Sequence, residues 1–304
     1  MAITTVKVTI DGQEHSLTYS DSSGKWEATV TAPSKSSYNQ PNHYYNVTVL
    51  ATDNAGNSTQ VDANSPEIGE SLRLQVKEKV KPTISITSPG EGSLLITGTP
   101  EITVQLRDDD SGISIDTFAL KIDSGEPVGS TSPGVSASPV EGGYDITYTP
   151  QEAMADGAHT ITVNVSDNDG NAADPATRNI TVDTVAPTLN VTSPAEGLVT
   201  NQTNIAVTGT TNDITSGPVT VTITLNSADQ GAVTVQEDGA FSKDIVLAEG
   251  ANVIVVTATD RAGKSTSVTR NVEVNTTAPK ITAVEIVPNP ADAGATYIIK
   301  VTVE

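Results

Sequence analysis

Short runs of alternating apolar and polar residues cover most of the chain, and each run ends in a cluster of turn-forming residues. Residues 45–50, 161–165 and 253–258 have the period of two that places every second side chain on the same face of a β-strand. Val, Ile and Thr fill these runs, whereas Gly, Asn, Asp and Pro separate them. No run has the long apolar period of an amphipathic helix. The pattern predicts an all-β protein made of short strands.

Two sequence motifs recur along the chain and indicate tandem domains. The turn after a strand reads ATDNAGN at 51–57, VSDNDGN at 165–171 and ATDRAGK at 258–264. A proline joint with its following strand reads KPTISITSP at 81–89 and APTLNVTSP at 186–194, and a looser copy begins APKI at 278. Proline suits the first position of a strand and cannot continue a helix, so these joints mark boundaries. We expect complete domains at 82–186 and 187–278, an incomplete domain at 1–81 and a strand pair at 279–304.

The alternation predicts the same strand order in both complete domains, lettered A, B, C, E, F and G. In the first, these strands are residues 83–87, 101–106, 117–122, 144–148, 159–165 and 178–182. In the second, strands B to G are 204–207, 219–225, a strand from 241, 252–258 and 269–274. Trp26, Tyr144 and Phe241 occupy matching places at the start of strand E, where we expect core residues.

The N-terminal segment aligns with the middle of the second complete domain. Residues 4–30 match residues 219–245 at a constant offset and without gaps. The alignment places Val6, Val8, Ile10, Gly24 and Trp26 on Val221, Ile223, Leu225, Gly239 and Phe241, respectively. We therefore expect the first domain to contain strands C to G and to lack A and B. Strands of the A and B type are expected at the other end, at 281–287 and 296–303.

These complementary ends predict strand donation between copies of the chain. A lone hairpin is marginally stable in water, and an uncovered apolar strand is a site of association. We expect residues 280–304 of one molecule to complete the first domain of the next, in a head-to-tail homo-oligomer that closes a ring or extends a filament. Burying about four side chains contributes on the order of 6 to 12 kcal/mol before the entropy of ordering. Truncation of a longer chain, or a different partner for the tail, remain open alternatives.

The expected interface residues follow from the inward positions of these strands. The donor residues are Ile281, Val284, Ile286, Tyr297, Ile299, Val301 and Val303. The acceptor residues are Val6, Val8, Ile10 and Trp26.

The repeated motifs resemble those of a known family. The TDxAGN turn, together with DTVAP at 183–187, is similar to the bacterial immunoglobulin-like repeats of surface adhesins and of phage tail and virion proteins. The resemblance implies an elongated rod of immunoglobulin-like sandwiches that acts as a spacer or attachment module. The Cys and Trp core of antibody domains is absent, because the chain has no Cys and its single Trp lies on another strand.

Composition and charge narrow the expected functions. A formal net charge of −21 opposes the binding of phosphate backbones, so we expect no nucleic-acid partner. No apolar run reaches membrane-spanning length, and the N-terminus has no basic segment followed by an apolar one, so we expect neither membrane insertion nor a signal peptide. We expect a phage virion or tail-associated fibre subunit, on a virion or extracellular surface, whose partners are itself and other virion or cell-surface proteins or glycans.

Two alternatives differ in class. One is a fragment or leaderless form of a bacterial surface adhesin stalk, which gene neighbourhood would distinguish. The other is a carbohydrate-binding accessory module, which needs an exposed aromatic platform that the aromatic content of 3% disfavours.

Residues that carry catalysis are scarce. The chain has no Cys, and its histidines, His15, His43 and His159, have no Ser or Asp partners at a recognisable spacing. We expect His159, at the start of a strand, to be an ordinary surface residue. No catalytic residue and no cofactor are predicted.

The strongest acidic run is Asp108, Asp109 and Asp110, followed by Ser-Gly. A solvated acidic turn is the favoured interpretation, and a calcium site is the weaker one, because the spacing of an EF-hand loop and its closing Glu are missing. An Asx-type turn accounts for Asp167. We expect calcium chelation to leave the thermal midpoint nearly unchanged.

A polar loop at residues 34–46 has no counterpart of similar length in the other domains. Long loops at the ends of sandwiches often carry binding sites. Tyr38, Tyr44 and Tyr45 flank this loop and are the predicted ligand contacts.

Overall fold

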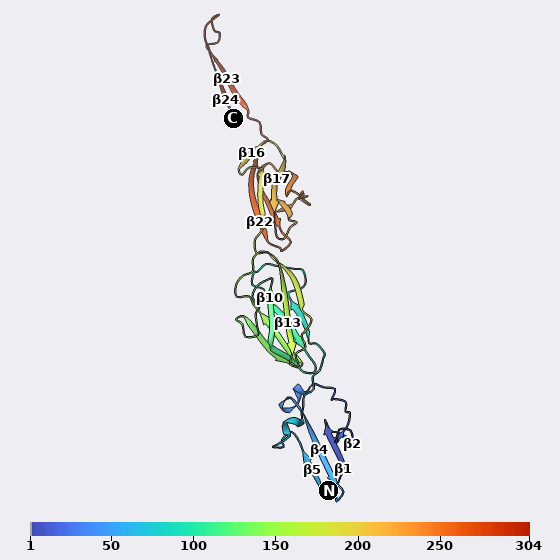
Figure 1. Ribbon diagram of the computed structural model, residues 1–304. Helices are drawn as coiled ribbons and strands as arrows, with labels where there is room; N and C mark the ends of the chain where they lie inside the picture. Colours follow the sequence, from blue (N-terminus) through green and yellow to red (C-terminus); the bar gives the residue numbers. More distant parts are fainter. Residues whose placement is uncertain (1) are drawn as a thin grey trace. The chain divides into compact units, whose positions relative to one another are not determined.

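The computed structural model describes residues 2–304, and nearly every regular element in them is a strand (Figure 1). The helical elements in this range are three short 3₁₀ turns, η1 (Ser37–Asn39), η2 (Pro41–His43) and η3 (Gly69–Leu72). The strands belong to two units, one that ends at Val182 and one that runs from Asp183 to Glu304. The all-β prediction is confirmed.

The first unit contains an open sheet, which we call the N-terminal sheet. Its strands run in the order β3-β2-β1-β4-β5, and β6 pairs with the start of β4. The strands are β1 (Ile3–Ile10), β2 (Gln13–Ser20), β3 (Lys25–Glu27), β4 (Tyr45–Asp53), β5 (Ser58–Val61) and β6 (Arg73–Leu74). Val6 and Val8 lie opposite Ala51 and Val49. Since side chains alternate along a strand, these four project from the same face.

The same unit contains a complete sandwich at residues 83–182, which we call the first sandwich. Its sheets have the orders β11-β12-β9-β7 and β10-β13-β14-β8. The strands are β7 (Thr83–Ser88), β8 (Ser93–Leu95), β9 (Ile102–Arg107), β10 (Ile113–Ile122), β11 (Val135–Val140), β12 (Gly143–Tyr148), β13 (Gly157–Asp167) and β14 (Ala176–Val182). Val104 and Ile146 of one sheet cluster with Leu120 and Ile161 of the other, and all four are fully buried. The two inner faces therefore form one apolar core.

The second unit contains the second sandwich, residues 188–274. Its sheets have the orders β15-β17-β20 and β16-β22-β21-β18-β19. The strands are β15 (Thr188–Ser193), β16 (Leu198–Thr200), β17 (Asn204–Asn212), β18 (Thr220–Leu225), β19 (Ala228–Asp229), β20 (Ala240–Val246), β21 (Gly250–Thr259) and β22 (Ser265–Val274). Val207 and Phe241 pack in one buried cluster with Ile223 and Ile254.

A hairpin follows the second sandwich. β23 (Ile281–Val287) pairs with β24 (Ile298–Val303), and these two strands form a separate sheet. Every residue from 275 to 304 is exposed. β23 has the predicted bounds, whereas β24 begins at residue 298 rather than 296. Tyr297 therefore lies outside the strand that was expected to contain it.

Several strands are missing from the sequence prediction, among them β8, β11 and β16. β8 and β16 contain three residues each, which is too short to establish a period, and they pair in parallel with β14 and β22. β11 contains Pro139 and small residues, which weaken a strand signal.

Trp26 is placed differently from the expectation that it is a core residue. β3 pairs with β2, and Trp26 is partly exposed, with its ring edge-on to Tyr19 at a centroid distance of 5.8 Å. The aligned Phe241 is buried in β20, which pairs with β17. The N-terminal sheet contains no strand in the place of β17, so this segment pairs with its neighbour in sequence.

Candidate functional site

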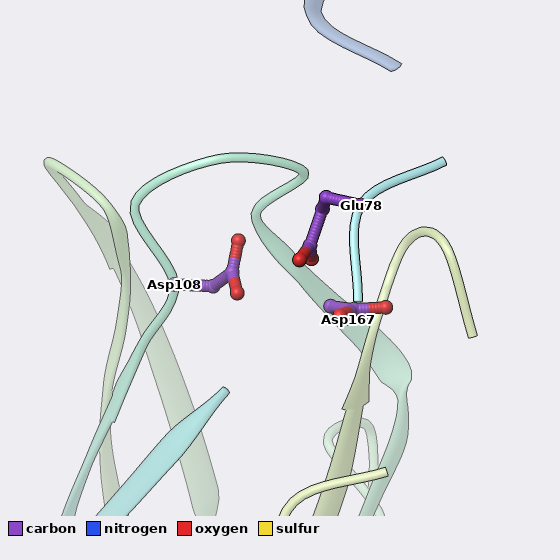
Figure 2. Close-up of side chains that lie close together, drawn as sticks. All are labelled: Glu78, Asp108 and Asp167. Atoms are coloured by element: carbon purple, nitrogen blue, oxygen red, sulfur yellow. The ribbon is translucent and has the colours of Figure 1, made fainter. Parts of the chain in front are cut away.

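Three carboxyl groups meet at one end of the first sandwich, those of Glu78, Asp108 and Asp167 (Figure 2). Glu78 lies in the segment before β7, Asp108 directly follows β9, and Asp167 is the last residue of β13. One carboxylate oxygen from each lies within 4.8 Å of the other two. Asp108 and Asp167 are 7% and 2% exposed, and Glu78 is partly buried. Because like charges repel in a buried site, this arrangement needs hydrogen-bond donors, a shared proton or a cation.

Protein donors supply much of what this cluster needs. The Asn171 backbone N–H donates to Asp167 Oδ1 at 2.8 Å, and Asn171 Nδ2 donates to Asp167 Oδ2 at 2.6 Å. The same amide reaches Glu78 Oε1 at 3.3 Å. The Gly112 N–H donates to Asp108 Oδ1 at 2.7 Å. Asp167, where an Asx-type turn was predicted, accepts the backbone N–H four residues on, whereas an Asx turn uses the N–H two residues on. The Asn171 side chain also bridges to the neighbouring carboxyl group.

Glu78 has the most perturbed environment of the three. Burial raises the pKa of Glu78 above its usual range, and its contact with Asp167 raises this pKa further. A carboxyl group with a raised pKa beside a second carboxylate favours a proton shared between them.

The predicted acidic run divides among three environments. Asp108 is buried, Asp109 is exposed, and Asp110 accepts the Ser36 backbone N–H at 3.1 Å. The solvated-turn interpretation is therefore wrong for Asp108. Only Asp108 of this run joins the cluster in Figure 2. Sequence reasoning missed Glu78, because a single acid in a joint has no spacing that marks it.

A second acidic cluster, Asp183, Asp213 and Asp260, lies in the second sandwich. Asp183 precedes β15 as Glu78 precedes β7, by five positions in both cases. Asp213 follows β17 as Asp108 follows β9, and Asp260 follows β21. The repeated turn in the sequence predicted that Asp260 is equivalent to Asp167. It did not predict that the joint acids, Glu78 and Asp183, or the loop acids after β9 and β17 are equivalent.

The predicted ligand loop folds back on itself. Tyr45 is 4% exposed, and its hydroxyl donates to a backbone carbonyl of the same loop at 3.1 Å. Tyr45 is thus a buried residue, contrary to the expected ligand contact. Tyr38 stacks on His43 with ring centroids 4.3 Å apart, and the Arg73 guanidinium lies 5.3 Å from the centroid of the Tyr44 ring. A ligand role for Tyr38 and Tyr44 stays a prediction.

His159 is a structural link rather than the exposed residue that we expected. Its Nδ1 lies 2.7 Å from Asp123 Oδ2, and its Nε2 lies 2.8 Å from the Ala155 carbonyl oxygen. Burial lowers the pKa of His159, but the hydrogen bonds to Ala155 and Asp123 outweigh burial and raise the pKa overall. Both ring nitrogens then act as donors, which is the arrangement of the protonated ring.

The predicted donor residues of the hairpin share one face, with the exception of Tyr297. The register pairs Ile286 with Ile299, Val284 with Val301, and Ile281 with Val303. These six side chains project from the same side of the hairpin and are 41% to 63% exposed. The opposite face carries an ion pair between Lys300 and Glu285, with Nζ 3.2 Å from Oε2.

The predicted acceptor residues lie on one face of the N-terminal sheet. Val6 is 8% exposed, and Val8, Ile10 and Trp26 are partly exposed. The aligned residues of β18 are buried beneath the sheet β15-β17-β20. Within residues 2–81, no second sheet faces the N-terminal sheet and no buried apolar cluster forms.

This architecture agrees with the similarity of the chain to known domains. Residues 111–184 match the bacterial Ig-like domain family, and residues 187–276 match the family described as glucodextranase, domain B. The match to the bacterial Ig-like family lies in the first sandwich, and the match to glucodextranase domain B lies in the second. The resemblance inferred from the sequence motifs is confirmed. Domains of this type are typically non-catalytic modules with structural or adhesive roles, displayed outside the cell.

Individual relatives are distant. Bacillopeptidase F of Bacillus subtilis is 29% identical over 164 residues, which is 50% of this chain and 11% of that protein. The tetra-tandem repeat from the extending region of a large adhesion protein has a TM-score of 0.35 and 18% identity, covering 98% of this chain and 79% of that one. The fibronectin(III)-like modules of Clostridium thermocellum CbhA have a TM-score of 0.37 and 16% identity, covering 64% and 94%. In residues 2–304, no helix has the length and apolar character needed to cross a bilayer.

Proposed function

We propose that the chain is a non-catalytic spacer or adhesive subunit of a virion or cell surface, and that its copies assemble head to tail. In this proposal the C-terminal hairpin of one copy covers the N-terminal sheet of the next. The observation that carries the proposal is the presence of two uncovered apolar faces, one on β23 and β24 and one on β1 and β4.

The hairpin has the pairing of the first two core strands of a complete sandwich. In the first sandwich, β7 pairs antiparallel with β9, which places Ile86 opposite Val104 in the core. β23 pairs with β24 in the same sense and places Ile286 opposite Ile299, but both of these residues are exposed. The hairpin therefore has the apolar face of such a strand pair and lacks the sheet that this face packs against.

The N-terminal sheet lacks the complementary part. In the second sandwich, β17 pairs with β15 on one edge and with β20, residues 240–246, on the other. The aligned residues 25–31 form strand only at 25–27, and residues 28–31 have no strand partner. β24 pairs with β23 on one edge and has its other edge free. The free edge of β24 in one copy is therefore available to residues 28–31 of another copy. Such a pair would correspond to the pairing of β17 with β20 in the second sandwich.

The apolar contact is large enough to matter. Complete burial of a Val or Ile side chain contributes about 1.5 to 3 kcal/mol, and the six hairpin side chains are about half exposed, so covering them contributes on the order of 5 to 10 kcal/mol. The acceptor face contributes a comparable area. The burial of both apolar faces together offsets the free-energy cost of association, which is about 4 to 15 kcal/mol.

The test replaces Ile299 by Asp in the full-length chain. A carboxylate on the apolar face has no partner there once that face is covered, so Ile299→Asp is expected to abolish assembly. Thr302→Asp is the matched control, because it adds the same charge to the opposite face of the same strand. Sedimentation velocity over a concentration series should show rings or filaments for the wild-type chain and for Thr302→Asp, and monomers for Ile299→Asp.

Two other outcomes contradict the proposal. A wild-type chain that stays monomeric at high concentration excludes assembly through these faces. A monomer in which Ile299→Asp still changes the fluorescence of Trp26 has its hairpin folded onto its own N-terminal sheet.

A peptide of residues 280–304, added during refolding, should occupy the acceptor and shorten the assemblies. Assemblies of unchanged length would show that they form through another surface.

A further inference from the structure

Tyr297 is an exposed aromatic residue that the C-terminal hairpin leaves without a strand partner. Its side chain is 54% exposed, and it directly precedes β24. The two strands of the hairpin pair only from Ile298 onwards, so residues 296 and 297 lie beyond the end of the pairing. No other aromatic residue occurs between positions 275 and 304. Tyrosine is enriched among the residues that anchor protein interfaces, so this position needs a structural explanation.

The strand register of the hairpin matches that of the second sandwich. Ile281 stands two positions after the proline of a joint and pairs with Val303. Leu189 stands two positions after the preceding joint proline and pairs with Thr211. Val303 of β24 is therefore the counterpart of Thr211 in β17.

Counting back six positions from each of these partners makes Tyr297 the counterpart of Ile205. Ile205 lies in residues 204–207, the part of β17 that pairs with β20 and not with β15. In that pairing Ile205 lies opposite Ile245, and the alignment of the N-terminal segment on the second sandwich equates Ile245 with Val30. In the head-to-tail assembly, Tyr297 of one copy would thus lie opposite Val30 of the next.

The N-terminal sheet has an open cleft at this position. The cleft has a volume of about 390 Å³ and lies between the end of β1, the start of β2 and the segment 29–33. Its apolar wall consists of Ile10, Val30 and Ala32, which are all partly or fully exposed. An apolar wall that is open to solvent can bury further area when a side chain enters the cleft.

The same place in the second sandwich is filled. The residues aligned with Ile10, Val30 and Ala32 are buried in one cluster, and Ile205 packs against that cluster. They are Leu225, Ile245 and Leu247. The cleft is therefore the space that remains when the strand carrying the counterpart of Ile205 is absent.

The residues on the two sides of this contact are complementary in size. Ala32 is smaller than the aligned Leu247, whereas Tyr297 is larger than its counterpart Ile205. Close-packed interiors tolerate a change of volume on one side best when the other side compensates for it. An aromatic ring from the hairpin therefore suits the space that Ala32 leaves.

We infer that the ring of Tyr297 in one copy fills the cleft of the next copy and anchors the recognition between copies. This inference rests on the proposed head-to-tail assembly and names the side chain that determines its affinity. Asp11 and His15 line the same cleft and offer polar partners to the phenol hydroxyl once the ring is buried. Insertion of the ring also pairs residues 296 and 297 with the acceptor, which extends β24 to the length of β17.

The test exchanges the sizes of the two partners in the full-length chain. Tyr297→Ala should weaken assembly by at least about 10-fold in sedimentation velocity, because the cleft is left empty. Ala32→Leu should also weaken assembly, since the added side chain occupies the space of the ring. A double variant, Tyr297→Ile with Ala32→Leu, reproduces the pair Ile205 and Leu247 and should recover most of the affinity that Ala32→Leu loses.

Ile298→Ala is the matched control. Ile298 follows Tyr297 directly, is 62% exposed and projects from the opposite face of β24. This substitution also removes apolar area from the hairpin, but it should leave assembly unchanged. Tyr297→Ala does not alter the acceptor, so its comparison with Ile298→Ala remains decisive if Ala32→Leu misfolds. Recovery in the double variant would itself show that the acceptor carrying Leu at position 32 is folded.

The outcomes separate this inference from strand donation. If Ile299→Asp abolishes assembly but Tyr297→Ala assembles as strongly as Ile298→Ala, strand donation stands and the anchor is another residue. If the double variant assembles no better than Ala32→Leu alone, the ring does not enter the cleft. A wild-type chain that stays monomeric overturns the proposed assembly and this inference with it.

Discussion

Replacing Gly239 by Ala should destabilise the second sandwich far more than replacing the aligned Gly24 destabilises the N-terminal sheet. Both glycines have positive φ, +82° at Gly239 and +68° at Gly24. A Cβ on Gly239 would lie 2.0 Å from the Thr211 carbonyl oxygen of β17. A Cβ on Gly24 would meet only the Tyr19 hydroxyl, at 3.9 Å. The two positions share the backbone conformation and differ in whether a strand lies beside them.

The magnitudes follow from these two contributions. A residue with a Cβ in the left-handed region costs about 1 to 2 kcal/mol, and this applies to both substitutions. At Gly239 the backbone clash also forces β17 away from β20. This movement breaks the hydrogen bond that the Thr211 N–H donates to the Gly239 carbonyl oxygen, which is 2.9 Å long in the wild-type chain. We expect a total loss of about 4 kcal/mol or more for Gly239→Ala, in the range reserved for backbone and core disruption.

The assay can address each region separately. Trp26 is the single Trp of the chain and lies in the N-terminal sheet, so its fluorescence in a urea titration reports the effect of Gly24→Ala. Amide hydrogen exchange of β17 and β20 reports the effect of Gly239→Ala. Equal losses of free energy at the two sites would refute the reasoning, because the neighbouring strand would then have no influence. If a donated β24 takes the place of β17, Gly24→Ala should fold as a monomer and still weaken assembly.

Two further substitutions test the titrating groups of the first sandwich. Glu78→Gln should raise the thermal midpoint at neutral pH, because burial and Asp167 raise the pKa of Glu78 and make its ionisation destabilising. The gain should vanish as the pH falls below 4.5, where the unfolded Glu is also protonated, and a gain that persists there would contradict the assignment. His159→Gln should destabilise the chain below pH 6.5, with the loss disappearing as the pH rises through the raised pKa of His159, as pH-dependent urea titrations can measure. A loss that does not depend on pH would show that packing, and not the pair with Asp123, sets the role of His159.

The sequence was most informative where strands are long and repeated. The alignment of residues 4–30 on 219–245 matches β1 to β18, and the structure pairs β1 with β4 as it pairs β18 with β21. Alternating apolar positions encode the buried face of such strands directly. The same alignment failed at Trp26, where the pairing partner of Phe241 has no counterpart in the sheet. A strand that needs a distant neighbour cannot be predicted from its own residues.

The acidic sites were largely beyond sequence reasoning. The Asp108 to Asp110 run stands out because its acids are adjacent, yet the structure places them in different environments. The acids that do meet come from separate segments, such as Glu78 and Asp183 in the joints, and Asp108 is the one member of the run among them. Only the closure of the sandwich brings these segments together, so no local spacing records the site.

The repeated Asp turn shows how one backbone feature serves different chemistry. In the N-terminal sheet, the Asn57 side chain donates to Asp53 Oδ2 at 2.9 Å, and this hydrogen bond, with others from the turn, lowers the pKa of Asp53. Asp260 makes the same backbone turn, but Lys264 leaves its second oxygen without a donor, and Asp183 adds another unsatisfied oxygen. The turn itself therefore explains why the motif recurs. The residue four positions later decides whether the second oxygen of the carboxylate receives a side-chain hydrogen bond from the turn.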